Sequence, residues 1–304
     1  MTTQTSRSTA KAVRRSPLGI LATATATHGT GRGDDTPLPK LSGFVESSFS
    51  PLAYEVSKEC LTERPGDGSR TAVVLASLQG DTITEDLAGQ RMVSGRVHNP
   101  LLFMQATANS VLGYLSREFQ ITGQMFSLST LDDPVTELLA MADLLFEDPE
   151  LERVLVLGVE LGGGERVAEV HRELAAGTGR PVPPASPAAT ATAGLAAAVL
   201  LGRPAAGAPV SVRPVSVRPA GGEANERNAG QAERHEAEGS GTAEHPGSIQ
   251  SLFELAVVHR RLLRDGGSHL LVTAPVAGRA PATFALTAHA PVPGRNETEN
   301  HADQ

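Results

Sequence analysis

The sequence predicts an α/β fold, and two buried strands with a helix between them carry this prediction. Residues 71–78 (TAVVLASL) and 153–161 (RVLVLGVEL) are continuous apolar runs of strand length, as expected for strands covered on both faces. Between them, residues 101–119 place apolar side chains at the spacing of a largely buried helix. Gly113 in this helix would let another backbone come close.

The rest of the chain adds elements of the same kinds. A buried helix should run from residue 134 to about 146, and helices are also expected at 50–63, 166–174 and 245–263. Further strands are expected at 18–26, 192–201 and 210–217, and strands 269–273 and 282–287 should form a closing hairpin.

A sharp strand-to-helix turn lies in the middle of the chain. Residues 124–130 alternate between two sets of side chains, which is typical of a strand with two different faces. Asp132 and Asp133 then precede Pro134, a pattern that favours the start of a helix. Asp132 therefore stands at an elbow where enzymes often place a nucleophile, although capping of the helix is the favoured interpretation.

Composition excludes several classes of function. A net charge of −8 over 304 residues argues against nucleic acid or an anionic membrane as the main partner. No run of 18 apolar residues is present, so no membrane span is expected. The single cysteine, Cys60, fits a cytoplasmic protein and is better interpreted as a small buried side chain than as a reactive thiol. No His, Asp and Glu set has metal-ligand spacing, and neither a metal nor a cofactor is expected.

Three polar segments should lack a packed structure. Residues 1–16 and 291–304 are expected to be disordered ends, and about 221–245 a loose loop without periodicity. The single domain would then span residues 17–290.

The elbow region resembles the first half of a β-ketoacyl synthase of the thiolase superfamily. That family reads Asn-x-x-x-Gly-x-x-Ser/Thr on the helix and Gly-Pro-x-x-x-x-x-Thr-Ala-Cys at the elbow. This chain has Asn109, Gly113 and Ser116 on the helix, then Gly123-Gln and Thr130-Leu-Asp132 at the elbow. The resemblance implies a thiolase-like layered αβαβα fold, with a second half truncated near residues 221–246. It also puts Asp132 at the position of the family's nucleophilic cysteine.

The resemblance also shows which catalytic groups this chain lacks. Ketosynthases use a thiolate to accept the acyl group and two histidines to assist decarboxylation. His28 opens a His-Gly-Thr-Gly sequence like that of one catalytic histidine, but it comes long before the elbow, and coincidence is the favoured interpretation. His245 and Glu254 keep the spacing of a second motif, yet Pro246 follows the histidine, so a remnant without function is favoured.

A silent ketosynthase-like chain suggests the role of a chain length factor in a type II polyketide synthase of the polyene type. The resemblance implies pairing through the strand before the elbow with an active ketosynthase. It also implies an acyl carrier protein whose phosphopantetheine bears the growing chain. Candidate tunnel or interface residues come from the helix and this strand: Phe103, Met104, Gln105, Asn109, Leu112, Met125 and Phe126. Ordinary core packing is an equally favoured interpretation for each of them.

Two alternatives stay open at this stage. The chain could be a thiolase-fold enzyme that uses Asp132 in place of cysteine, in which case replacing Asp132 should abolish its activity. It could also be a scaffold unrelated to acyl chains, with a filled interior and no tunnel at its dimer interface.

Overall fold

The computed structural model describes residues 17–31, 33–44, 46–95, 100–129, 133–162, 165–178, 193–204, 207–215, 248–273 and 281–289. The predictions for residues 1–16, 221–245 and 291–304, and those for Asp132 and His245, lie outside these ranges.

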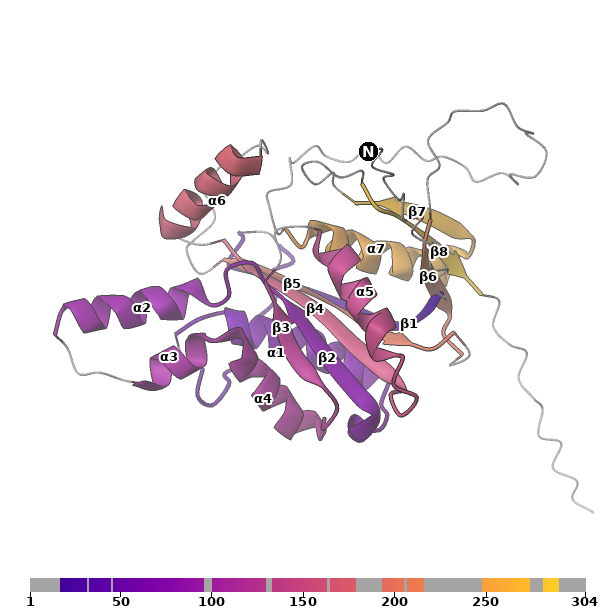
Figure 1. Cartoon of the computed structure of the whole chain (residues 1–304), viewed down its shortest axis with the longest axis horizontal. Helices are drawn as coiled ribbons and strands as arrows, with labels where there is room; N and C mark the ends of the chain where they lie inside the picture. The colour runs from indigo at the N-terminus through magenta and orange to yellow at the C-terminus, as the bar shows by residue number, and fades with distance from the viewer. Residues whose placement is uncertain are drawn as a thin grey trace, which may run out of the picture.

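An eight-stranded mixed sheet runs through the molecule in the order β3-β2-β4-β5-β1-β6-β8-β7 (Figure 1). The strands are β1 Leu18–His28, β2 Thr71–Ala76, β3 Met125–Leu128, β4 Arg153–Leu161, β5 Gly194–Gly202, β6 Val210–Pro214, β7 Ser268–Val272 and β8 Thr283–Ala288. β2 is parallel to both β3 and β4, and every other pairing is antiparallel. The strands that the sequence predicts are all present, including the closing hairpin of β7 and β8.

The helices cover both faces of this sheet. They are α1 Phe49–Glu63, α2 Thr82–Val93, α3 Pro100–Ala106, α4 Ala108–Phe119, α5 Pro134–Leu145, α6 Glu165–Thr178 and α7 Gln250–Asp265, with a short 3₁₀ helix at Gly68–Arg70. α1 and α4 pack on one face through a cluster that includes Leu52, Leu115 and Leu155. α5 and α7 pack on the other face through Leu138 and Leu255.

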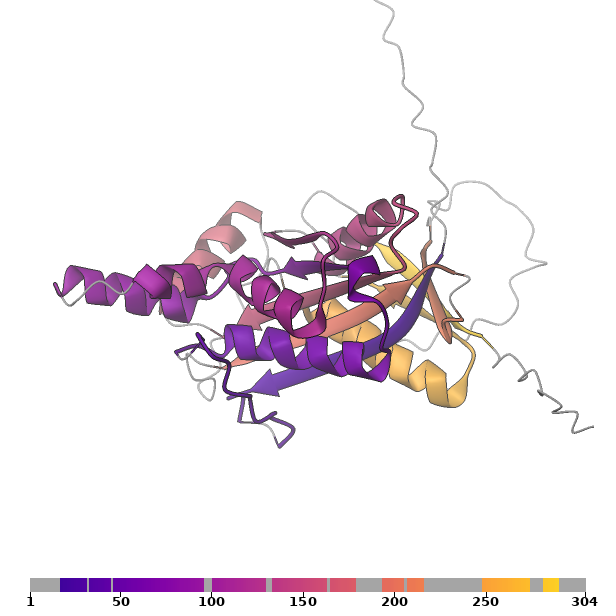
Figure 2. The same cartoon turned by 90° about the horizontal axis from the view of Figure 1, so that it is seen from below.

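The second half of the chain folds back over α7. Leu271 of β7 and Phe284 of β8 are buried in the same cluster as Leu255 of α7, so this helix lies between the first strands and β6-β8-β7. Figures 1 and 2 show the resulting layers from two sides. The fold is a layered α/β fold, as predicted, and within the described residues its second half consists of three strands and one helix.

The predicted helix over residues 101–119 is in fact two helices. Thr107 is extended between α3 and α4, with φ −72° and ψ 132°. Its hydroxyl bonds to the Met104 carbonyl at 3.0 Å, and the Ser110 hydroxyl donates to the same carbonyl. These hydroxyls occupy an acceptor that a continuous helix would use, and so they end α3. The expectation for Gly113 was also wrong for the described chain, because no atom from outside its own stretch of helix lies within 4 Å of a Cβ built there.

A buried arginine holds the ends of β2 and β4 that point away from the elbow. Arg153 opens β4 and is only 9% exposed. Its guanidinium donates to the Thr71 hydroxyl at 2.8 Å and to the Arg64 carbonyl at 2.7 Å. Burial lowers the pKa of Arg153, and these acceptors stabilise its charged form.

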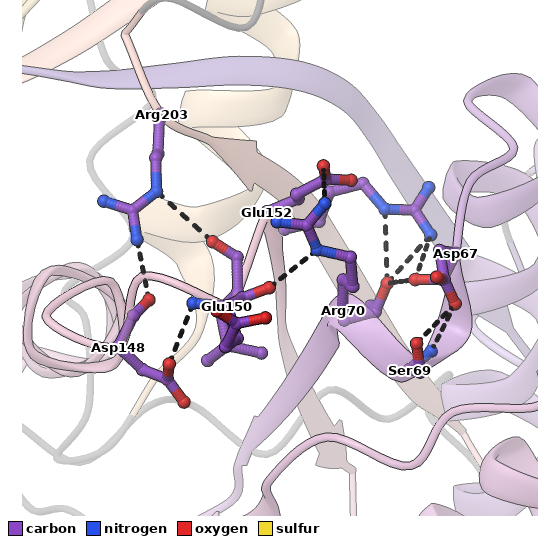
Figure 3. Close-up of polar contacts among 10 residues, drawn as sticks. Asp67, Ser69, Arg70, Asp148, Glu150, Glu152 and Arg203 are labelled. Carbon is purple, nitrogen blue, oxygen red and sulfur yellow. Dashed lines mark hydrogen bonds and ion pairs between the residues drawn. The ribbon is translucent and has the colours of Figure 1, made fainter.

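Two further arginines tie the neighbouring loops to the same end of the sheet. Arg70 pairs with Glu152 at 2.5 Å, and Arg203 donates to the Asp148 carbonyl at 2.7 Å (Figure 3). Arg203 also lies over the ring of Phe146, 5.4 Å from its centroid. Because these guanidinium groups bind the chain itself, we assign this end of the sheet a structural role.

None of the helices in the described ranges has both the length and the apolar character needed to span a membrane.

Candidate functional site

α5, the helix that follows β3, begins with an acidic cap residue, Asp133. The Asp133 carboxylate accepts hydrogen bonds from the Thr136 amide at 3.1 Å and from its hydroxyl at 2.7 Å. Pro134 occupies the first turn, where its missing N–H costs nothing. Helix capping is therefore confirmed for Asp133, while Asp132 lies outside the described residues and its role stays a prediction from the sequence.

A second carboxylate binds the start of α7. Glu160, near the end of β4, accepts a hydrogen bond from the Ile249 amide at 3.2 Å. Helix N-termini favour negative charge, so α5 and α7 each have this preference satisfied by the chain itself.

A third carboxylate, that of Glu254 on α7, interacts with Asp133 at the start of α5. Burial raises the pKa of Glu254 on α7, and the charge of Asp133 raises it further, while a hydrogen bond to Gln250 acts in the opposite direction. A thiolate or an oxyanion placed here would meet carboxylates of like sign. This electrostatic environment is poorly suited to the chemistry of a ketosynthase.

Cys60, the only cysteine, cannot serve this site. It lies on α1 at 0% exposure, with its sulfur 3.8 Å from the Ala198 carbonyl. Burial raises the pKa of the thiol above its usual value. Its prediction as a buried apolar residue is confirmed. His28 lies at the end of β1, where its Nδ1 contacts the Thr36 carbonyl at 3.0 Å.

β3 forms one edge of the sheet and pairs only with β2 among the described residues. Its four side chains are all half-buried. Met125 packs against the α1 and α4 face, and Phe126 against the α5 and α7 face. The unpaired edge thus presents free backbone groups beside partly covered apolar side chains, the usual template for pairing with another chain.

Two helices, α2 and α3, form an arm near this edge, because α3 packs against α4 and α4 packs against β3. Figures 1 and 2 show α2 running outward from the body of the protein, with α3 beside it. Exposed apolar side chains gather here: Met92, Val93, Leu101, Phe103 and Met104. They make up half of the ten exposed large apolar side chains of the described chain, and we call α2 and α3 with these residues the apolar arm. Such a concentration of exposed apolar residues marks an interaction surface.

The structure places the predicted tunnel and interface residues in different environments. Phe103 and Met104 are 46% and 65% exposed on the apolar arm. Gln105 is half-buried, and Asn109 is exposed at the start of α4. Leu112 is buried in the α1 and α4 cluster. Their roles in a tunnel or an interface stay predictions.

Sequence reasoning missed α2, although a signal for it was present. Asp81 caps the helix by accepting hydrogen bonds from the Thr84 amide at 3.1 Å and its hydroxyl at 2.8 Å. Glu85 follows in the first turn, so the start of the helix could have been found. Burial raises the pKa of Asp81, while hydrogen bonds from Ser47 and Thr84 partly oppose that effect.

Comparison with known proteins shows the fold. No model of a known protein family and no curated protein sequence matches this chain. A solved structure of a "Ketosynthase (ApeO) in Complex with its Chain Length Factor (ApeC) from Xenorhabdus doucetiae" matches with a TM-score of 0.54 and 19% identity, over 90% of this chain and 99% of the matched chain.

Two further complexes give similar matches. "The ishigamide ketosynthase/chain length factor" has a TM-score of 0.56 at 13% identity, over 90% of this chain and 100% of the matched one. The AntDE:AntF complex, described as a type II PKS acyl-carrier protein with its ketosynthase bound to the hexaketide, has a TM-score of 0.59 at 9% identity, over 91% and 100%. The chain therefore has the fold found in ketosynthase and chain length factor complexes.

Proposed function

We propose that this protein is a non-catalytic subunit like a chain length factor, which pairs with an active ketosynthase. The observation that carries the proposal is the unpaired edge of β3 next to the apolar arm. A strand edge supplies backbone hydrogen bonds, and the exposed apolar side chains supply the buried area that a stable interface needs. A partner of the same fold can offer a matching strand edge.

The chemistry at the elbow supports a silent subunit. Sequence places Asp132 where a ketosynthase has its cysteine, and the only cysteine of the chain is buried on α1. Asp133 and Glu160 already bind the N-termini of α5 and α7. A carboxylate is a poor nucleophile toward a thioester, and an acyl-aspartyl anhydride hydrolyses readily. The partner would supply the cysteine and both histidines.

The extent of the structural matches supports the same proposal. About nine-tenths of this chain spans 99% or 100% of each of the three matched chains. The match therefore leaves almost no part of these chains uncovered, and each of them comes from a complex that contains a ketosynthase. The polyene type of synthase and a cytoplasmic location are further parts of the proposal.

In this proposal the complex extends acyl chains by decarboxylative Claisen condensation on an acyl carrier protein. The subunit shapes the tunnel for the growing chain, which hangs from phosphopantetheine. Phe103, Met104 and Leu112 form its end, assisted by Gln105, Asn109, Met125 and Phe126. One of the similar structures holds an acyl-carrier protein with its ketosynthase, which supports the carrier as a partner.

Reconstitution tests this function directly. A candidate ketosynthase, malonyl-loaded carrier protein and this chain are mixed, and the products are analysed by mass spectrometry. We expect elongation only when both subunits are present, and its loss when the ketosynthase cysteine is replaced by alanine. Asp132→Ala and Asp132→Asn in this chain should change turnover by less than about twofold, because the nucleophile belongs to the partner.

Activity of this chain without a ketosynthase would support the alternative, a thiolase-fold enzyme that uses Asp132. If this chain acts alone on the acyl carrier protein, and both Asp132 variants abolish that activity, the proposal of a silent subunit is wrong.

A further inference from the structure

One buried histidine has no part in the proposed function. His259 lies on α7, faces β1 and is 1% exposed. Its Nδ1 is 2.9 Å from the hydroxyl of Thr23, which is itself buried. Its Nε2 is buried and has no hydrogen-bond partner among the described residues. A neutral ring fits this position with one satisfied nitrogen, but a charged ring would have a buried N–H without an acceptor.

The charges near this ring add to the cost of protonation. Arg260, the next residue of α7, and Arg64, which follows α1, both act on His259 as like charges. Arg260 donates to the Thr25 hydroxyl at 3.0 Å and lies within electrostatic reach of Glu59 on α1. That carboxylate offsets Arg260 without reaching the ring directly.

Within the part of the chain that the structure describes, the other elements around α7 give no close counter-charge to His259. β5 and β8 carry no charged residue, and Arg213 of β6 is exposed. His269 of β7 contacts the Arg261 guanidinium at 2.8 Å. At the far end of α7, Glu254 interacts with Asp133 of α5.

The position of His259 makes it a joint between the two halves of the chain. α7 packs on β1 and β5 of the first half and on β7 and β8 of the second. We propose that His259 is a pH-sensitive joint, whose protonation releases α7 from β1 and loosens the second half of the fold. This inference goes beyond the proposed function and does not depend on it.

The sign of the effect follows from the two protonation states. Burial, followed by the charges of Arg260 and Arg64, lowers the pKa of His259 to about 4. Once α7 is released, the pKa returns to about 6.5. The released state therefore binds the proton more readily. The packing of α7 on β1 is fully stable above about pH 6.5, and this stability is lost progressively as the pH falls toward 4.

Hydrogen–deuterium exchange of α7 tests the joint in the protein as purified, alone or with a partner. Exchange of residues 250–265 is measured at pH 7.5 and 5.0 and corrected for intrinsic chemical rates. Between these values we expect α7 protection to fall about 30-fold relative to that of α5, which has no histidine. His259→Asn, whose amide can still bond to Thr23, should abolish this pH dependence, while the control His269→Asn should keep it.

Two results would overturn the proposal. One is equal loss of protection in α7 and α5 of the unaltered protein, a comparison that stands even if His259→Asn fails to fold. The other is an unchanged pH dependence in His259→Asn.

Discussion

Replacing Phe103 and Met104 together by aspartate should weaken binding to the ketosynthase partner at least about 100-fold. Both side chains are largely exposed on the apolar arm, at 46% and 65%, so the fold does not depend on burying them. In the complex they would lose apolar contact and bring two carboxylates into a dry interface. Together these effects exceed the roughly 3 kcal/mol that a 100-fold change in affinity requires. Titration calorimetry or biolayer interferometry measures the affinity.

Leu270→Asp provides a matched control. Leu270 is also a large apolar residue that is exposed, at 50%, but it lies on β7 at the opposite end of the sheet. This variant should bind the partner as the unaltered chain does. If Leu270→Asp weakens binding and the double variant does not, the interface has been assigned to the wrong end of the sheet.

Gly123→Ala should lower the free energy of unfolding by about 3 kcal/mol and also weaken partner binding. A Cβ at Gly123 would lie 2.2 Å from the Thr71 carbonyl oxygen, a backbone atom that the sheet holds in place. The adjacent Gln124 carbonyl accepts a hydrogen bond from the Val73 amide at 2.9 Å, where β3 joins β2. Relief of the clash must therefore move β3, the strand that we assign to the interface. Urea denaturation followed by circular dichroism measures the stability.

Gly113→Ala is the matched control for this substitution. Gly113 lies within α4, and a Cβ there meets no atom within 4 Å. Alanine should stabilise the helix by about 0.5–1 kcal/mol. Destabilisation by Gly113→Ala with no effect of Gly123→Ala would contradict the account of how β3 is held.

The fold was largely predictable because two of its central strands, β2 and β4, are mainly apolar. β2 and β4 are covered on both faces, and their sequences show this as continuous apolar runs. Asp133 before Pro134 correctly indicated the start of α5. The break at Thr107 was not predictable from apolar spacing, because the spacing continues across it and the hydroxyls of Thr107 and Ser110 decide the outcome.

The candidate site was less predictable for a physical reason. Apolar residues on a helix indicate that a face is covered, but they do not say what covers it. Leu112 is covered by the chain's own core, whereas Phe103 and Met104 are exposed in this single chain. Only the folded structure separates these two groups and puts the exposed one on α3, which packs against α4, the helix in contact with β3.

The most direct test of the central claim is co-expression with a candidate ketosynthase, followed by size-exclusion chromatography with light scattering. We expect one complex whose mass equals that of the ketosynthase plus 31.6 kDa, the mass of one copy of this chain. A stable species of twice 31.6 kDa that binds none of the ketosynthases offered would contradict the proposed role as a partner subunit.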